Sequence, residues 1–412
     1  MERKSLTMAL LGTILIAAFV MFIPLSDASA SEVKTLKVGC TLPLNVGFGV
    51  ETKKALEIIV PAFNQAGGFD INGQKYHVDL IIYDDKYRPN IGRAAVERLV
   101  NKDGVKFNVC QIGSGPTLAG LAVTEPAKVV TFCGGASSKL IGPKNHYTFG
   151  TSTTRTSIMA LWLMVKKVFP NAKTVVNLSP DDETGHARAK TETKIAEAMG
   201  LKVLGTIYYP RKTTDFAPFA TKVMTLKPDL VDYPGAVAGT QLGLQFKALY
   251  EAGFSGGHIS AMTPKMDEVT AVAPKEALEG VLATMTATEI PTPPPLAKEF
   301  KQAYIKKYGN WSTASLTWIP GWYAFVEAVK KANSVDPQVV AEVISKTGLE
   351  WNCPTYEARL VKRPDLGSNR YCDVVGASCY GQIKDGKMSF VGKPALDEVI
   401  GACERLYGGN WR

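Results

Sequence analysis

The stretch ALEIIVPAFNQAGGFDINGQKYHVDLIIYDD at residues 55–85 contains a helix followed by a strand. Its first half places apolar residues three and four positions apart and ends at the glycine pair 67–68, which predicts an amphipathic helix. In residues 78–83, Val78, Leu80 and Ile82 alternate with the other three residues up to two acidic residues at 84–85, which predicts a strand. With a further strand predicted at 36–41, the stretch indicates the strand-helix-strand unit of a parallel sheet.

The same alternation continues along the chain in two series. The first series adds strands at residues 107–112 and 129–133, with a short helix from Thr117 between them. The second series begins with a helix at 157–169 and alternates up to a strand at 258–262. A repeated strand-helix pattern is typical of a parallel sheet covered by helices. The sequence therefore predicts an α/β protein with two doubly wound lobes.

The chain is expected to pass between these lobes more than once. Residues 289–295 are rich in helix breakers and predict a crossover, after which helices at 297–308 and 321–332 return to the first lobe. Several crossovers imply a hinge. The predicted division is a signal peptide at 1–30, a first lobe at 31–150 plus 287–378, and a second lobe at 151–286 plus 379–412.

The N-terminus has the pattern of a cleaved secretory signal. Arg3 and Lys4 precede an apolar run at 8–23, and the small-residue tripeptide 28–30 follows it. The alternative is a membrane anchor, but the run is shorter than the ~20 residues that a spanning helix needs. The net charge of +9 comes from lysines and arginines scattered singly, so nucleic-acid binding is not expected. We expect a soluble, exported protein.

The seven cysteines and the short motifs give no sign of a metal site or of catalysis. No CxxC pair, HExxH, P-loop or GxSxG sequence occurs, so we expect no metal, no cofactor and no catalytic residue. Cys40, Cys110 and Cys133 fall in or beside predicted strands, where buried free thiols are the usual state. In an oxidising compartment, one or two disulfides could form among the last four cysteines, Cys353, Cys372, Cys379 and Cys403.

Two loops rich in glycine and serine follow neighbouring strands of the first lobe. One is centred on Ser114, with Pro116 where a helix would start, and the other spans residues 134–138. Ligands of doubly wound sheets bind beyond the carboxyl ends of the strands, and amides and hydroxyls there can hold a carboxylate. Two ordinary tight turns are the alternative. The candidate carboxylate-binding residues are Ser114, Gly115, Gly135, Ala136 and Ser137.

Aromatic residues cluster at two further loops. Phe48 lies in the loop after the first strand, and Trp318, Trp322 and Tyr323 stand at a junction between a loop and a helix. In a binding cleft these rings would form an apolar wall. The alternative, packing in the core or at the lobe interface, is equally open for the two tryptophans.

With its motifs in this order, the chain resembles the type I periplasmic binding proteins of ABC transporters, in particular the leucine/isoleucine/valine-binding branch. The resemblance covers nearly the whole mature chain, and its motifs are FNQAGG at 63–68, IYDD at 82–85, LV at 99–100, GV at 104–105, TDF at 214–216 and PDLV at 228–231. It implies two Rossmann-like lobes joined by a three-crossover hinge, which close over a ligand. It also implies that Ser114 and the loop of Gly135, Ala136 and Ser137 hold the ligand carboxylate, with Phe48 as a wall.

The second lobe departs from the family pattern. Amino acid binders of this family hold the ligand ammonium with a tyrosine and a glutamate, whereas this sequence has Thr184 and, about where the acid falls, Lys265, with Asp267 as the alternative counterpart. A lysine attracts an anion and repels an ammonium, and Arg155 also lies near the start of this lobe. An aromatic or other organic acid is favoured, and a branched-chain or hydrophobic amino acid stays open.

The resemblance implies a function in transport. We expect a periplasmic substrate-binding protein of an ABC importer, monomeric, that binds a small carboxylate-bearing molecule and delivers it to the membrane permease subunits. A ligand-sensing receptor domain of the same fold is an alternative, because fold does not fix function. A hydrolase that uses Ser114 as its nucleophile is a third hypothesis.

Overall fold

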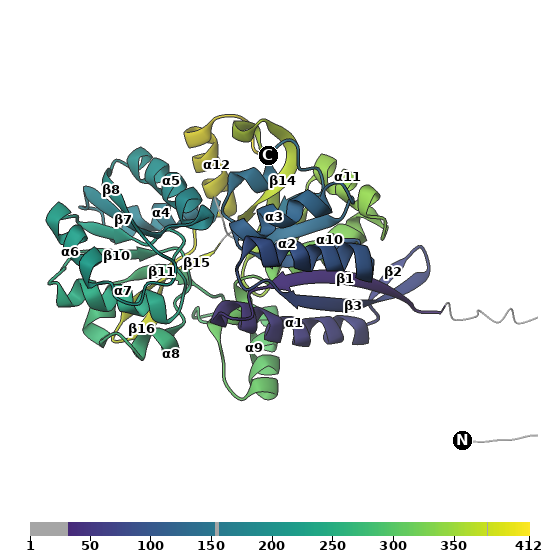
Figure 1. Ribbon diagram of the computed structural model, residues 1–412, viewed down its shortest axis with the longest axis horizontal. Helices are drawn as coiled ribbons and strands as arrows, with labels where there is room; N and C mark the ends of the chain where they lie inside the picture. Colours follow the sequence, from purple (N-terminus) through teal and green to yellow (C-terminus); the bar gives the residue numbers. More distant parts are fainter. Residues whose placement is uncertain (1–31, 153–155, 377) are drawn as a thin grey trace, which may run out of the picture.

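The computed structural model describes residues 32–152, 156–376 and 378–412. The predicted signal peptide and Arg155 lie outside these ranges. Figure 1 shows two α/β lobes side by side, one drawn mainly in purple and blue and the other in teal and green. The predicted two-lobed α/β fold is therefore confirmed. No helix within the described ranges has the length and apolar character that a membrane span requires.

The first lobe is built on a six-stranded sheet with the order β2-β3-β1-β4-β5-β6. All neighbouring strands are parallel except β2 and β3, and β1 pairs with β3 from Lys34 opposite Tyr76 to Leu42 opposite Asp84. The strands are β1 (Lys34–Leu42), β2 (Phe69–Ile71), β3 (Gln74–Asp84), β4 (Phe107–Ile112), β5 (Val130–Gly134) and β6 (Thr148–Gly150).

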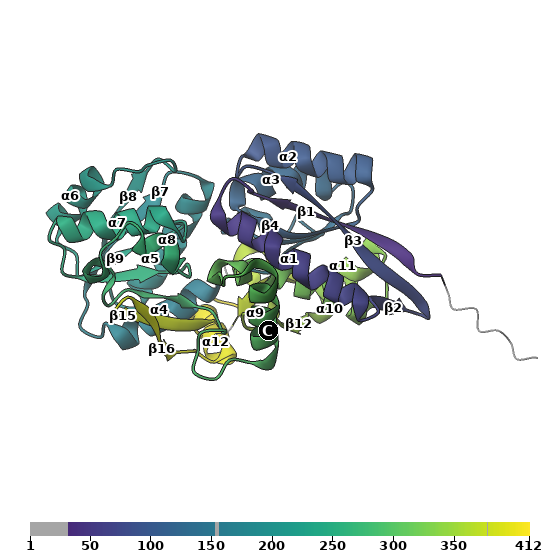
Figure 2. The ribbon, with the colours of Figure 1, turned by 90° about the horizontal axis from the view of Figure 1, so that it is seen from below.

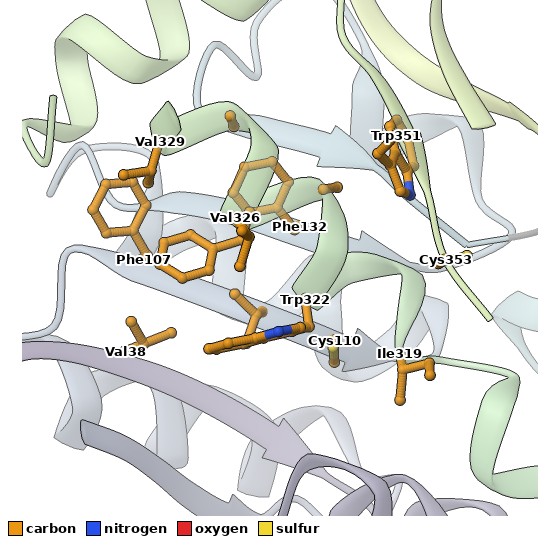
Figure 3. Packing of buried hydrophobic residues seen from close by; sticks show 14 of the residues in the cluster. Val38, Phe107, Cys110, Phe132, Ile319, Trp322, Val326, Val329, Trp351 and Cys353 are labelled. Carbon is orange, nitrogen blue, oxygen red and sulfur yellow. The ribbon is translucent and has the colours of Figure 1, made fainter. Parts of the chain in front are cut away.

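Helices cover both faces of this sheet, with α2 and α3 on one face and α1, α10 and α11 on the other (Figure 2). Their bounds are α1 (Gly47–Gln65), α2 (Pro89–Arg98), α3 (Ser114–Thr124), α10 (Pro320–Ala332) and α11 (Pro337–Thr347). Helix α9 (Pro295–Tyr308) packs against α1. Trp322 is 1% exposed and lies among Val38, Phe107 and Val326 in the core of the lobe (Figure 3). Of the two tryptophans left open by the sequence, Trp322 is therefore a core residue.

The second lobe contains a seven-stranded sheet with the order β16-β15-β11-β10-β9-β7-β8. Its strands are β7 (Thr174–Pro180), β8 (Lys202–Tyr209), β9 (Leu230–Asp232), β10 (Gly257–Ser260), β11 (Leu282–Met285), β15 (Cys379–Lys384) and β16 (Lys387–Gly392). Helices α4 (Thr156–Val168) and α5 (Glu183–Ala198) cover one face, and α6 (Ala217–Leu226) and α7 (Thr240–Glu251) cover the other. The short helix α8 (Met266–Thr270) packs on α7, and α12 (Leu396–Tyr407) packs on α4.

The chain passes between the two sheets three times. It leaves the first sheet after β6, returns after β11 to the helices α9 and α10, and enters the second sheet again at β15, which pairs antiparallel with β11. A third sheet, β12 (Glu350–Asn352), β13 (Glu357–Arg363) and β14 (Ser368–Gly376), precedes the last passage. Because β14 packs on β6 and α11 of one lobe and on α4 and α12 of the other, the predicted lobe boundaries stay predictions.

All seven cysteines are buried thiols that form no disulfide. For Cys40, Cys110 and Cys133 this is the predicted state. For Cys353, Cys372, Cys379 and Cys403 the disulfides considered from the sequence are wrong. The four thiols lie in different parts of the fold: Cys353 belongs to the core of the first lobe, Cys372 to a small cluster beside it, Cys379 to the start of β15, and Cys403 to the α12 side of the second lobe.

Buried His258 makes the second lobe sensitive to acid. Tyr233 Oη lies 2.6 Å from its Nδ1, and Phe246 and Phe254 pack against its ring. Burial lowers the pKa of His258 to about 4. An unfolded histidine titrates near pH ~6.5, so the unfolded state takes up the proton first and the native state loses stability as the pH falls from ~6.5 to ~4. We expect this histidine to account for a loss of about 3 kcal/mol over that interval.

The measurement is urea unfolding at several acidic pH values for the wild type and for His258→Gln. The variant should lose clearly less stability per pH unit below pH ~6.5 than the wild type. His146→Gln, which replaces an exposed histidine, is the matched control and should keep the wild-type slope. Equal slopes for wild type and His258→Gln would contradict the assignment.

Candidate functional site

A small cavity of about 50 Å³ lies between the two lobes. Its walls come from loops and helix starts that follow strands of both sheets, as expected for doubly wound sheets. The first lobe contributes Phe48, Tyr87, Ile112, Gly113, Ala136 and Trp318. The second lobe contributes Thr184, Arg188, Arg211, Ala236, Val237 and Met262.

Aromatic rings form the wall on the first-lobe side. The ring centroid of Phe48 lies 6.1 Å from that of Tyr87, edge to face, and 6.4 Å from that of Trp318. Tyr87 adopts a φ of 56°, which a bulky residue rarely takes, and Asp85 Oδ1 accepts its N–H at 2.7 Å. Any side chain at Gly134 would collide with the Trp318 ring, so this glycine lets the indole lie against the end of β5. The predicted wall roles of Phe48 and Trp318 agree with this geometry.

Arg211 brings a positive charge to the opposite side of the cavity. It follows β8 and lies over the Tyr87 ring, with 5.3 Å between the guanidinium carbon and the ring centroid. Its Nε donates to Asp182 Oδ2 at 2.7 Å, and its Nη1 donates to the carbonyl of Gly235 at 2.9 Å. Asp182 also caps α5 by accepting the N–H of Gly185. These contacts hold the guanidinium in one orientation against the cavity.

Arg188 is the second cation that borders the cavity. It lies in the second turn of α5 and is 6% exposed. Its Nε donates to Glu192 Oε1 at 2.7 Å, and Glu192 is fully buried. The i,i+4 spacing places both side chains on the same face of the helix. The carboxylate thereby fixes the direction of the arginine side chain.

The start of α5 connects the two lobes directly. Thr184 Oγ1 lies 3.1 Å from Tyr87 Oη and accepts the N–H of Ser114 at 3.3 Å. Ser137 Oγ donates to Glu183 Oε1 at 2.7 Å, and Lys139 Nζ lies 3.1 Å from the same oxygen. These contacts run from one lobe to the other, so the structure corresponds to lobes that are closed on each other.

The two predicted carboxylate-binding loops are adjacent, but the structure places most of their residues outside the cavity. Ser114 is fully buried, and its Oγ accepts the N–H groups of Ala136 at 2.9 Å and Ser137 at 3.1 Å. The amides that we expected to face a ligand are therefore occupied by this hydroxyl. Of the five predicted residues only Ala136 lines the cavity, and Ser114, Gly115, Gly135 and Ser137 do not. Burial of Ser114 also removes it as an accessible nucleophile.

Of the residues predicted for the second lobe, one lines the cavity and another does not. Thr184 lines the cavity, as expected. Lys265 does not: it borders an adjoining space of about 180 Å³, and its Nζ lies 2.6 Å from Glu268 Oε1 and 3.6 Å from Asp267 Oδ2. Its charge is paired with two acids, and the predicted contact of Lys265 with a ligand anion stays a prediction. Nothing can be added for Arg155, which lies outside the described residues.

Three important residues were not predicted. Tyr87, Arg188 and Arg211 all border the cavity, and two of them closely follow strands: Tyr87 comes three residues after β3 and Arg211 two residues after β8. A search of every loop that follows a strand could have found both. Arg188 offers no such signal, because one arginine within a helix is usually a solvated surface residue.

Comparison with known proteins agrees with the family that the sequence resembles. The model of the family described as "Periplasmic binding protein" matches residues 43–363. A leucine-binding protein from Thermotoga maritima superposes with a TM-score of 0.70 at 18% identity, covering 88% of this chain and 99% of that one.

Two solute-binding proteins of ABC transporters from Rhodopseudomonas palustris give similar values. One, in complex with 3,4-dihydroxybenzoic acid, has a TM-score of 0.69 at 21% identity and covers 88% of this chain and 98% of its own. The other, in complex with 4-hydroxybenzoate, has a TM-score of 0.69 at 19% identity and covers 88% and 96%. At such identities these structures show a shared fold.

Proposed function

Since this chain belongs to the periplasmic binding protein family, which consists of binding proteins and not enzymes, we propose that it is the substrate-binding protein of an ABC importer. It captures a small carboxylate-bearing ligand between its lobes and delivers it to the permease subunits in the membrane. The secretory pattern of residues 1–30 supports export to the periplasm.

The charge of the residues that line the cavity favours one class of ligand. Arg188 and Arg211 border the cavity, and among the described residues that line it there is no carboxylate. Such a lining attracts an anion and offers no partner for an ammonium group. The rings of Phe48, Tyr87 and Trp318 suit a flat apolar body. An aromatic acid is therefore the favoured ligand, in line with the two Rhodopseudomonas palustris complexes, and a branched-chain or hydrophobic amino acid is second.

Ligand entry requires the lobes to separate. The cavity of about 50 Å³ is far below the ~300 Å³ or more that is usual for ligand pockets. The contacts of Thr184 with Tyr87 and Ser114 must open before a ligand reaches the arginines. Hinge opening and closing through the three crossovers supplies that movement.

Ligand-dependent thermal stabilisation tests the function. A ligand that binds only the folded protein, at 100 times its Kd, stabilises by about 2.7 kcal/mol, which for a protein of this size corresponds to roughly 3–4 °C in Tm. We expect such a shift with benzoate, 4-hydroxybenzoate or 3,4-dihydroxybenzoate.

Each acid is paired with its uncharged amide as a matched control, and leucine, isoleucine and valine form a second set. The amides should give no shift, because they lack the charge that the two arginines would hold. If only the amino acids stabilise the protein, the ligand class proposed from the arginines is wrong. If no carboxylate from either set does so, the proposed function is abandoned.

A further inference from the structure

Behind Arg188, away from the cavity, two carboxyl groups are in contact. Glu192 comes from α5 and Asp232 from the end of β9, and both are fully buried. Glu192 Oε1 accepts the hydrogen bond from Arg188, and the side chains of Asp232 and Glu192 are hydrogen-bonded to each other. Two carboxyl groups can share a hydrogen bond only if one of them is protonated.

The hydrogen bonds around this pair also indicate that one of the two carboxyl groups is protonated. If both groups were ionised, Glu192 Oε2 and Asp232 Oδ2 would each be buried without a donor from the part of the chain that the structure describes. A buried acceptor without a donor is costly. One proton on Asp232 supplies a donor to Glu192 and removes a second negative charge from the interior.

The charged and titratable groups around the pair are few. Arg188 is the cation in contact with it, and Tyr233, next to Asp232, is a buried phenol bonded to His258. Tyr380 of β15 is a further buried phenol close to Arg188. Burial, together with the negative charge of Glu192, raises the pKa of Asp232 well above its ordinary value. The burial and the contact geometry therefore agree on a neutral Asp232.

We propose that Asp232 is a positioning residue for ligand binding: as a neutral acid it keeps its proton and donates a hydrogen bond to Glu192, so that Glu192 holds the Arg188 guanidinium toward the cavity. The proposal rests on the proposed function, because it takes Arg188 as a contact of the ligand anion. Asp232 itself touches no ligand. Its influence passes through Glu192 to Arg188.

Infrared spectroscopy of the ligand-free protein tests the protonation directly. At neutral pH the wild type should show the C=O band of a buried protonated carboxyl group, and Asp232→Asn should lose it. Glu192→Gln should shift the band, because the hydrogen-bond partner changes from a carboxylate to an amide. Glu197→Gln replaces an exposed acid on the same helix and should leave the band unchanged. Absence of the band from the wild type would overturn the proposal.

Benzoate affinity measured by calorimetry tests the positioning role. Asp232→Leu removes the donor and should weaken binding on the order of 10-fold, whereas Asp232→Asn keeps an N–H donor without a charge and should restore affinity to within about threefold of the wild type. If Asp232→Asn instead binds benzoate 10-fold more tightly, Asp232 is ionised in the wild type and the proposal is wrong. Unchanged affinity in Asp232→Leu would also refute it.

The two measurements test the ligand class and the protonation of Asp232 separately. Should the wild type fail to bind benzoate while the carboxyl band is present, the proposed aromatic ligand is wrong and the neutral Asp232 stands. Should benzoate bind while the band is absent, the ligand proposal stands and the role of Asp232 falls. Circular dichroism of each variant identifies a loss of folding. The loss of the band in Asp232→Asn and its shift in Glu192→Gln assign it to this pair, because burial also raises the pKa of Asp85 to about 7.

Discussion

Replacing Arg211 with glutamine should weaken the binding of benzoate by about 100-fold, which corresponds to ~2.7 kcal/mol. The guanidinium is oriented by Asp182, by the carbonyl of Gly235 and by the face of Tyr87, so it is ready to bind an anion without further ordering. Hydrogen bonds between ionised partners in a closed site contribute about 1.5–3 kcal/mol each. Isothermal titration calorimetry at constant ionic strength measures the effect.

Two controls define what this loss means. Lys212→Gln removes an exposed positive charge next to Arg211 and should change the affinity by less than about twofold, because exposed charges are screened. The double variant Asp182→Asn with Arg211→Gln keeps the local charge balanced and should bind as weakly as Arg211→Gln alone. Binding of benzoate by Arg211→Gln within about threefold of the wild type would exclude Arg211 as the anion contact.

The long, periodic elements of both lobes were predictable from local patterns. The strands β4 and β10 were expected within two residues of their positions, because buried parallel strands are short apolar runs between helices with a clear period. The start of helix α5 is harder to predict, since its first turns are polar and its cap is Asp182. Polar first turns carry no apolar period to detect.

The last quarter of the chain lacked such patterns. Strands β11 and β15 pair although about a hundred residues separate them, and β12 has only three residues. No local periodicity encodes a pairing of that kind. Helix α12 has an apolar face, but the sequence does not show that this face packs on α4. These elements depend on tertiary contacts that a single sequence does not display.

The residues of the candidate site could be predicted only in part. The sequence correctly predicted that Ser114 and the loop at 134–138 lie together, because both follow neighbouring parallel strands. It could not show that the Ser114 hydroxyl takes up the loop amides itself. Arg188 and Arg211 come from an ordinary helix position and an ordinary loop, and only the tertiary structure shows that both border the cavity.

Replacing Arg363 with methionine should lower the free energy of unfolding by about 3–5 kcal/mol, the range found when one partner of a buried ion pair is removed. Arg363 ends β13 and is 3% exposed. Its Nη1 donates to Asp373 Oδ2 at 2.5 Å and its Nη2 to Asp365 Oδ2 at 2.8 Å, and Asp373 is fully buried. Its guanidinium also lies over the Trp411 ring at 4.6 Å, so packing is lost together with the charge.

The loss should affect the whole protein, because the sheet that carries Arg363 lies against both lobes: β14 packs on β6 and α11 of one lobe and on α4 and α12 of the other. Denaturant unfolding followed by tryptophan fluorescence measures the change. Arg359→Met, in the same strand but partly exposed and paired with Glu350, should cost less than about 1 kcal/mol. Adding Asp373→Asn to Arg363→Met should recover part of the lost stability, because it removes the buried negative charge. If Arg363→Met and Arg359→Met unfold at the same denaturant concentration, the buried ion pair does not stabilise the junction between the lobes.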